Sequence, residues 1–137
     1  MEGAMPRLKD QDRAGAADRA VRAYLGGPGK KDKPTEYRQE LQQLPSRILA
    51  SGLGQTLAFY ASKTGSKSPE TSGDIHAIIG GEVARFLTQG KVTTTVGLLN
   101  EIMAGDTGHY CRRTREALAF AEWLTRYAAA LIEKPKK

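Results

Sequence analysis

The chain has 137 residues, with 21 Lys and Arg against 15 Asp and Glu, and a formal net charge of +6. Such a length predicts one domain that buries a core without disulfides or metals. The single cysteine, Cys111, excludes an intramolecular disulfide and is typical of a reducing compartment, so we expect the cytoplasm. No apolar run reaches the roughly 18 residues of a membrane span, and no signal-peptide core follows the first residues. The positive charge favours an anionic partner.

The first predicted helix spans residues 8–25. Its apolar positions include Ala17, Val21 and Tyr24, which recur at the spacing of one helical face. A loop rich in glycine, proline and lysine follows, because glycine provides a left-handed exit and proline cannot extend the helix.

A second helix is expected after an N-cap at Thr35. Pro45 lies inside this helical run, where proline removes one backbone hydrogen bond and collides with the preceding turn. We therefore expect a kink or a restart, with Leu44 and Pro45 opening a separate short helix that ends at Ala50.

Two glycines separate this region from a third helix, which is predicted over residues 55–63. Gly52 is expected to end the preceding helix and Gly54 to allow a tight restart, a structural role that we favour over RNA contact. Residues 64–73 are rich in Gly, Ser and Thr and are predicted to form a loop.

The next predicted helix begins after a cap at Asp74 and carries a broad apolar face from Ile75 to Leu87. Gly80 and Gly81 lie within it. They either allow another helix to approach closely or weaken this helix.

Two more helices complete the prediction. One of the threonines at 93–95 caps a short helix, and Asp106 caps a long one that runs to about Glu133. The long helix is expected to organise the domain. The predicted fold is all-α, a compact bundle of six or seven helices with no sheet. It forms a single domain over residues 1–137, with flexible tails at 1–7 and 134–137.

The basic excess lies at both ends of the chain. Residues 1–34 carry eight basic and five acidic side chains, and residues 106–137 carry seven and four, whereas residues 35–105 carry six of each. Arg112, Arg113 and Arg115 concentrate this charge within one turn of the last helix.

A phosphate backbone is the natural partner of such an arginine group. A solvated face with local ion pairs is the alternative, since Arg112 can pair with Glu116 one turn later. We predict that Arg112 and Arg113, with Arg47 and Lys63, form an RNA-facing surface, because these helix-borne cations have the fewest acids nearby in sequence.

The residues that commonly carry catalysis are sparse. His76 and His109 are the only histidines, and His109 and Cys111 point to nearly opposite sides of a helix. This disfavours a Cys–His nucleophile or a local metal site, and Cys111 is expected to be a buried, inert thiol. Glu36 and Glu40 share a helical face, but no third acid or histidine joins them. We expect no enzyme activity, no metal and no cofactor.

Most aromatic residues fall on predicted apolar stripes and are expected to pack in the core. Tyr110, beside Arg112 and Arg113, is the exception that we single out as a candidate base-stacking residue. The aromatic residues assigned to the core are Phe59, Phe86, Phe120, Trp123 and Tyr127.

Several short motifs recur in one known family. They are EYR at 36–38, LP at 44–45, SGLGQTLAF at 51–59, IMAGD at 102–106 followed by Tyr110, and EALAFAEWL at 116–124, with Ala23-Tyr24 in the first helix. Together they resemble the small helical subunit of the type III-B CRISPR-Cas effector, the Cmr RNA-guided RNA-targeting complex. The resemblance covers most of residues 20–133.

This resemblance implies a compact helical bundle that acts in antiviral defence without catalysing a reaction. Copies would stack along a ribonucleoprotein with other Cmr subunits and line the groove that holds the guide RNA–target RNA duplex. No membrane and no small-molecule substrate is implied. The alternatives are a free-standing helical DNA-binding regulator and a purely structural interaction protein.

Overall fold

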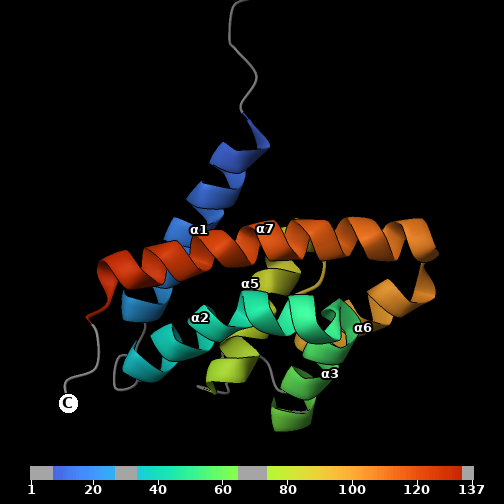
Figure 1. The fold of residues 1–137 in the computed structure, drawn as a ribbon, viewed down its shortest axis with the longest axis horizontal. Helices are drawn as coiled ribbons and strands as arrows, with labels where there is room; N and C mark the ends of the chain where they lie inside the picture. Colours follow the sequence, from blue (N-terminus) through green and yellow to red (C-terminus); the bar gives the residue numbers. More distant parts are fainter. Residues whose placement is uncertain (1–7, 27–33, 65–73, 134–137) are drawn as a thin grey trace, which may run out of the picture.

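The structure, a computed structural model, describes residues 8–26, 34–64 and 74–133. In these three ranges it contains six helices and no strand, which confirms the predicted all-α bundle (Figure 1). Both predicted tails and residues 65–73 of the predicted loop lie outside the described residues, and Thr64 ends a helix. The helices are α1 (Lys9–Gly26), α2 (Pro34–Ser51), α3 (Leu53–Thr64), α5 (Ile75–Thr88), α6 (Thr95–Ala104) and α7 (Thr107–Leu131).

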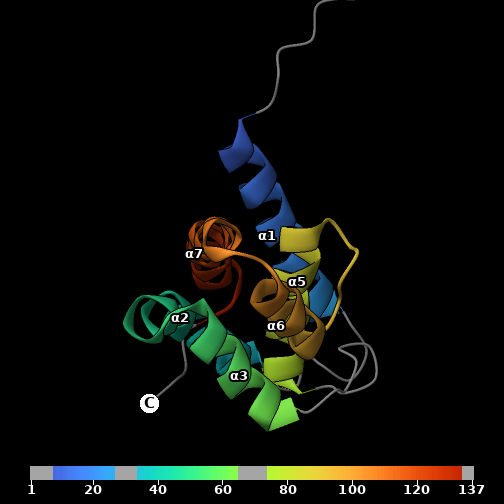
Figure 2. The same cartoon turned by 90° about the vertical axis from the view of Figure 1, so that its right-hand side faces the viewer.

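The longest helix, α7, organises the bundle as predicted. It contacts each of the other five helices, and Figure 2 looks almost along its axis. It ends at Leu131, two residues earlier than expected. Small residues dominate its inward face, which lets neighbouring helices approach closely. Its buried residues are Ala117, Phe120, Ala121, Leu124 and Ala128.

Three predicted helix caps are confirmed, because each depends on residues that are close in sequence. The second helix differs, since α2 begins at Pro34 rather than after Thr35. Proline suits the first turn, where a helix has no internal partner for the backbone N–H that proline lacks. The confirmed caps are Asp74, which accepts from His76 N–H at 2.8 Å, Thr94, which accepts from Gly97 N–H at 3.1 Å, and Asp106, which accepts from His109 N–H at 2.9 Å.

The predicted restart at Pro45 is wrong, because α2 continues through this proline to Ser51. Pro45 has no N–H to donate to the carbonyl of Leu41. The hydroxyl of Thr125 in α7 lies 2.8 Å from that carbonyl and 2.9 Å from the carbonyl of Ala121, so its one hydrogen is shared between the two acceptors. A contact between helices thus replaces the missing bond within the helix.

Gly52 and Gly80 have structural roles that the sequence indicated, whereas Gly54, predicted to precede the third helix, lies inside α3. Gly52 adopts φ +88° between α2 and α3. Gly54 donates its N–H to the hydroxyl of Tyr110 at 2.9 Å, and an added Cβ would lie 3.0 Å from that oxygen. A Cβ on Gly80 would overlap the hydroxyl of Thr95, so this glycine allows α5 and α6 to approach closely.

Candidate nucleic-acid interface

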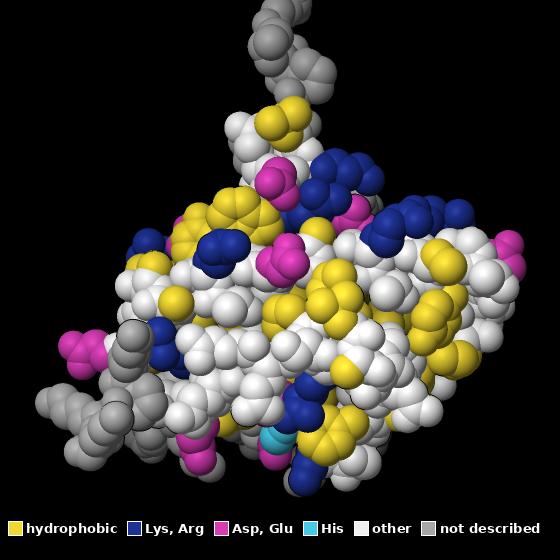
Figure 3. All heavy atoms as spheres, in the orientation of Figure 1, with side chains coloured by type: hydrophobic (Ala, Val, Ile, Leu, Met, Phe, Trp, Pro, Cys, Tyr) yellow, Lys and Arg dark blue, Asp and Glu magenta, His cyan; other side chains and the backbone are white. Residues whose placement is uncertain are grey.

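The four predicted RNA-facing cations lie in two regions. Arg112 and Arg113 belong to the first half of α7, whereas Arg47 of α2 and Lys63 of α3 meet at the ring of Phe59. Figure 3 shows basic side chains along the upper edge, over α1 and α7, and a separate basic group beside a histidine at the lower edge, over α3. The structure therefore brings each pair together but not all four residues.

Arg113 is bound by groups of its own chain. Its Nη2 donates to Oε2 of Glu101 at 2.8 Å, its Nε donates to Oε1 at 3.2 Å, and its Nη1 donates to the carbonyl of Leu87. His109 Nε2 lies 3.0 Å from the same carboxylate. The hydrogen bonds from Arg113 lower the pKa of Glu101 despite its partial burial. Arg113 therefore joins α7 to α6 and to the end of α5.

Arg113 has few acids nearby in sequence, but a contact between helices supplies one. Glu101 lies twelve positions earlier, on another helix, and reaches Arg113 only because α6 and α7 meet at the turn around Gly105. An added Cβ on Gly105 would overlap the ring of His109, so this glycine allows the tight turn that forms the cluster.

Arg112 differs from its neighbour. The predicted pairing with Glu116 is wrong, because Arg13 of α1 binds that carboxylate at 2.6 and 3.1 Å and lowers its pKa. Arg112 is exposed and forms no ion pair with any acid in the described part of the chain. Arg115, one turn further along α7, is exposed too. The outer face of α7 thus presents positive charge to solvent.

Arg47 is held much as Arg113 is. Its Nε donates to Oε2 of Glu40 at 2.9 Å and its Nη2 donates to Gln43 at 2.7 Å. Tyr60 donates to the same Glu40 oxygen at 2.7 Å, and burial together with this bond raises the pKa of the tyrosine. The Arg47 guanidinium carbon lies 4.8 Å from the centroid of the Phe59 ring.

The prediction that Phe59 is a core residue is wrong. Its side chain is 36% exposed, and Lys63 Nζ lies 5.4 Å from the ring centroid. Lys63 is exposed and forms no ion pair within the described residues. His76 contacts the ring edge-to-face at 5.8 Å. We call Arg47, Phe59, Lys63 and His76 the Phe59 cluster.

The other predicted aromatic core residues are partly or fully buried, as expected. Phe120 is buried and stacks on the partly buried Phe86, while Trp123 and Tyr127 pack at the core edge. Tyr110 is half-buried with its hydroxyl bound by Gly54.

Cys111 is exposed, so the prediction of a buried thiol is wrong. It lies beside Arg112 on the outer face of α7, opposite the apolar stripe that faces the core. The described residues contain no group of three or more His, Cys, Asp or Glu that could hold a metal ion.

Comparison with known proteins identifies the family. The family model described as CRISPR-associated protein (Cas_Cmr5) matches residues 9–131, nearly the whole described helical bundle. The chain belongs to the Cmr5 family. This confirms the resemblance to the small helical subunit of the type III-B CRISPR Cmr complex, and family membership implies other Cmr subunits as partners.

A curated Cmr5 protein and a solved Cmr5-family structure, both from Thermus thermophilus, support this assignment. The CRISPR system Cmr subunit Cmr5 is 32% identical over 128 residues, which cover 93% of this chain and 99% of that protein. A crystal structure of a CRISPR-associated Cmr5 family protein matches with a TM-score of 0.74 and 33% identity, covering 93% of this chain and all of the other. None of the helices described here is long and apolar enough to span a membrane.

Proposed function

We propose that this Cmr5-family chain is a non-catalytic small subunit of the type III-B effector, in which copies stack and line the groove that holds the guide RNA–target RNA duplex. Its biological role would be antiviral defence in the cytoplasm. The observation that carries the RNA contact is the unpaired cationic face of α7, where Arg112 is exposed without an acidic partner in the described chain.

The non-catalytic role is supported by the state of the carboxylates. Glu101 and Glu116 each accept hydrogen bonds from an arginine, which lower the pKa of both carboxylates. Such bonds favour the ionised form, and a general acid must instead hold a proton near neutral pH. These carboxylates are therefore suited to supporting the fold, and cleavage of RNA would belong to other subunits.

The proposed RNA contacts divide by how each cation is held. Arg112 and Lys63 are free to reach phosphates, which attract cations regardless of base sequence. Arg47 and Arg113 are instead held by Glu40 and Glu101, whose carboxylates balance their positive charge. Sequence specificity would come from base pairing with the guide rather than from this protein.

The ribonucleoprotein role is favoured over a free-standing DNA-binding regulator. A recognition helix must present base-reading side chains along the surface that enters the groove. In α7 the apolar stripe from Ala117 to Ala128 is buried against other helices, and the family match is to a CRISPR-associated protein.

Charge reversal in the assembled complex tests the proposal. Complexes reconstituted from purified subunits and guide RNA should bind target RNA about tenfold more weakly or worse when every copy carries Arg112→Glu. Arg126→Glu is the matched control, since Arg126 is exposed on the second half of the same helix. Unchanged affinity for Arg112→Glu, in a complex with the normal subunit content, would contradict the RNA contact.

A further inference from the structure

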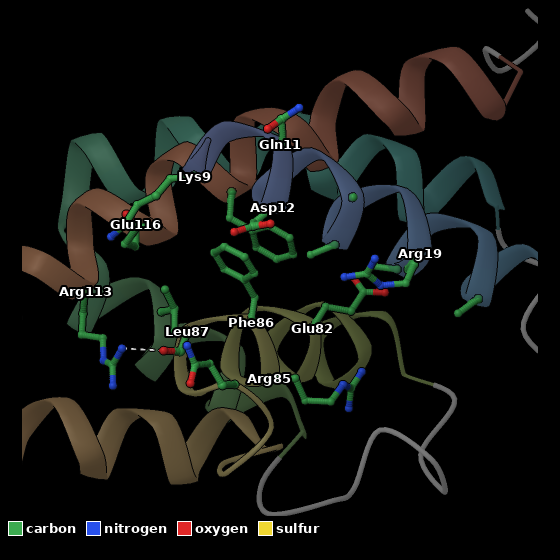
Figure 4. A pocket seen from close by; sticks show the side chains of 16 residues that line it. Lys9, Gln11, Asp12, Arg19, Glu82, Arg85, Phe86, Leu87, Arg113 and Glu116 are labelled. Atoms are coloured by element: carbon green, nitrogen blue, oxygen red, sulfur yellow. Dashed lines mark hydrogen bonds between the residues drawn. The ribbon is translucent and has the colours of Figure 1, made fainter. Parts of the chain in front are cut away.

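A groove of about 1030 Å³ separates α1 from α5, and α7 forms its floor (Figure 4). Of the four predicted RNA-facing residues, Arg113 lines the groove, and Arg47, Lys63 and Arg112 do not. Helix α1 packs mainly against α7, so one of its long faces looks into the groove rather than onto another helix.

The walls of the groove have the periodicity of two helices. On α1 the lining positions include Asp12, Ala16, Arg19 and Ala23, and on α5 they include Glu82, Arg85 and Phe86. Both sets follow the three- and four-residue spacing of one helical face. The α1 wall runs from Lys9 to Ala23, about 20 Å or four helical turns. A space that two helical faces bound over this length has the shape and the length to hold another helix.

Apolar side chains form one part of a lining that is otherwise mostly polar or charged. Phe86 of α5 lies half-buried and stacks on the buried Phe120 of α7, with ring centroids 4.3 Å apart and ring planes inclined by 11°. Ala16 and Ala20 of α1 add methyl groups, and small side chains allow helix axes to approach to about 8–10 Å. An apolar helical stripe is complementary to these apolar residues.

The charges at the rim favour acidic groups on the occupant. Of the three acids that line the groove, Glu116 is bound by Arg13 at 2.6 Å, Glu82 is bound by the Tyr37 hydroxyl at 2.9 and 3.0 Å, and Asp12 also has an interaction partner. Lys9 and Arg19 are exposed at the rim, and neither forms an ion pair in the described ranges. They remain available to carboxylates of a partner.

We propose that this groove binds an amphipathic helix of another Cmr subunit. The apolar stripe of that helix lies on Phe86 and the alanines of α1, and its acidic residues flank Lys9 and Arg19. The inference rests on the proposed role within the complex, but it concerns a different surface from the RNA contact.

Filling the groove tests the proposal. Ala20→Trp places an indole in the groove, and Ala129→Trp places one on the exposed face of α7 as the matched control. Complexes are assembled from the purified Cmr subunits and guide RNA. The protein concentration at half-maximal incorporation should be at least about tenfold higher for Ala20→Trp than for the wild type. Ala129→Trp should be incorporated like the wild type. Normal incorporation of Ala20→Trp would overturn the inference.

A surface variant covers the case in which Ala20→Trp does not fold. Arg19→Glu changes only an exposed side chain, and it should weaken incorporation severalfold because it opposes the acidic flank. Wild-type incorporation of a folded Arg19→Glu protein would contradict the acidic partner.

Photo-cross-linking identifies the occupant. A photoreactive phenylalanine derivative at Gln11, which is exposed and lines the groove, should cross-link to an apolar and acidic helical segment of another Cmr subunit. Cross-links to RNA, to a second copy of this chain, or to nothing would overturn the proposal. If Ala20→Trp incorporates normally while Arg112→Glu weakens RNA binding, the groove inference alone fails. If Ala20→Trp is incorporated poorly while Arg112→Glu leaves RNA binding unchanged, the RNA contact alone fails.

Discussion

Two regions contain the same types of residue: the α6–α7 junction, where Glu101 meets Arg113, and the Phe59 cluster, where Glu40 meets Arg47. In each, a glutamate binds an arginine and lies near a histidine. Glu101 binds Arg113 at 2.8 Å with His109 at 3.0 Å, and Glu40 binds Arg47 at 2.9 Å with the His76 ring at 3.8 Å. In each, a second cation predicted to face RNA is left without an acid.

The two regions differ in what the bound arginine contacts next. Arg113 also donates to the backbone carbonyl of Leu87, so it connects three helices. Arg47 lies against the exposed ring of Phe59 at the surface. The same ion pair thus supports helix packing in one region and orders a surface in the other, and the following variants test this difference.

The largest expected effect is on Arg113. Arg113→Met should lower the free energy of unfolding by about 2 kcal/mol, because it removes charged hydrogen bonds and leaves a backbone carbonyl without its donor. Urea unfolding of the isolated protein measures this change. Arg112→Met, next to it on the exposed face, should change stability by less than about 0.5 kcal/mol. Equal losses for the two variants would remove the distinction between them.

A smaller effect is expected in the Phe59 cluster. Arg47→Met should cost about 1 kcal/mol, because it removes the partly exposed pair with Glu40 but leaves no backbone carbonyl without its donor. Lys63→Met, its matched control, should cost less than about 0.5 kcal/mol. A loss for Arg47→Met as large as that for Arg113→Met would show that the contact with Leu87 adds little.

The smallest expected effect is a change in pH dependence. The folded-state pKa of Glu101 is lowered by Arg113, so this carboxylate stabilises the fold above its unfolded pKa near 4.5. That contribution is lost as pH falls through the folded pKa. Glu101→Gln should therefore lose less unfolding free energy than the wild type between about pH 6 and about pH 3. An unchanged pH profile would contradict the assigned role of Glu101.

The parts of the fold that were predictable are local. The caps at Asp74, Thr94 and Asp106 and the apolar stripe of α7 depend on residues within a few positions of one another. The continuity of α2 was not predictable, because the group that compensates Pro45 is Thr125, from a helix far along the chain.

Contacts between residues far apart in the chain also explain the wrong predictions at the candidate site. A helical pattern reveals only acids about one turn away, but Glu101 is twelve residues from Arg113 and Glu116 binds Arg13 across 103 positions. Phe59 followed the apolar spacing of α3, and only the packed structure leaves its ring exposed. No local signal in the sequence separates the free Arg112 from the bound Arg113.

The most direct test of the distinction between the free Arg112 and the bound Arg113 is the salt dependence of target-RNA binding by the reconstituted complex. We predict that Arg112→Gln makes the slope of log affinity against log salt concentration shallower, by about one for each copy of the protein on the duplex. Arg113→Gln should leave the slope unchanged in complexes that assemble fully. A slope reduced by Arg113→Gln but not by Arg112→Gln would contradict the account.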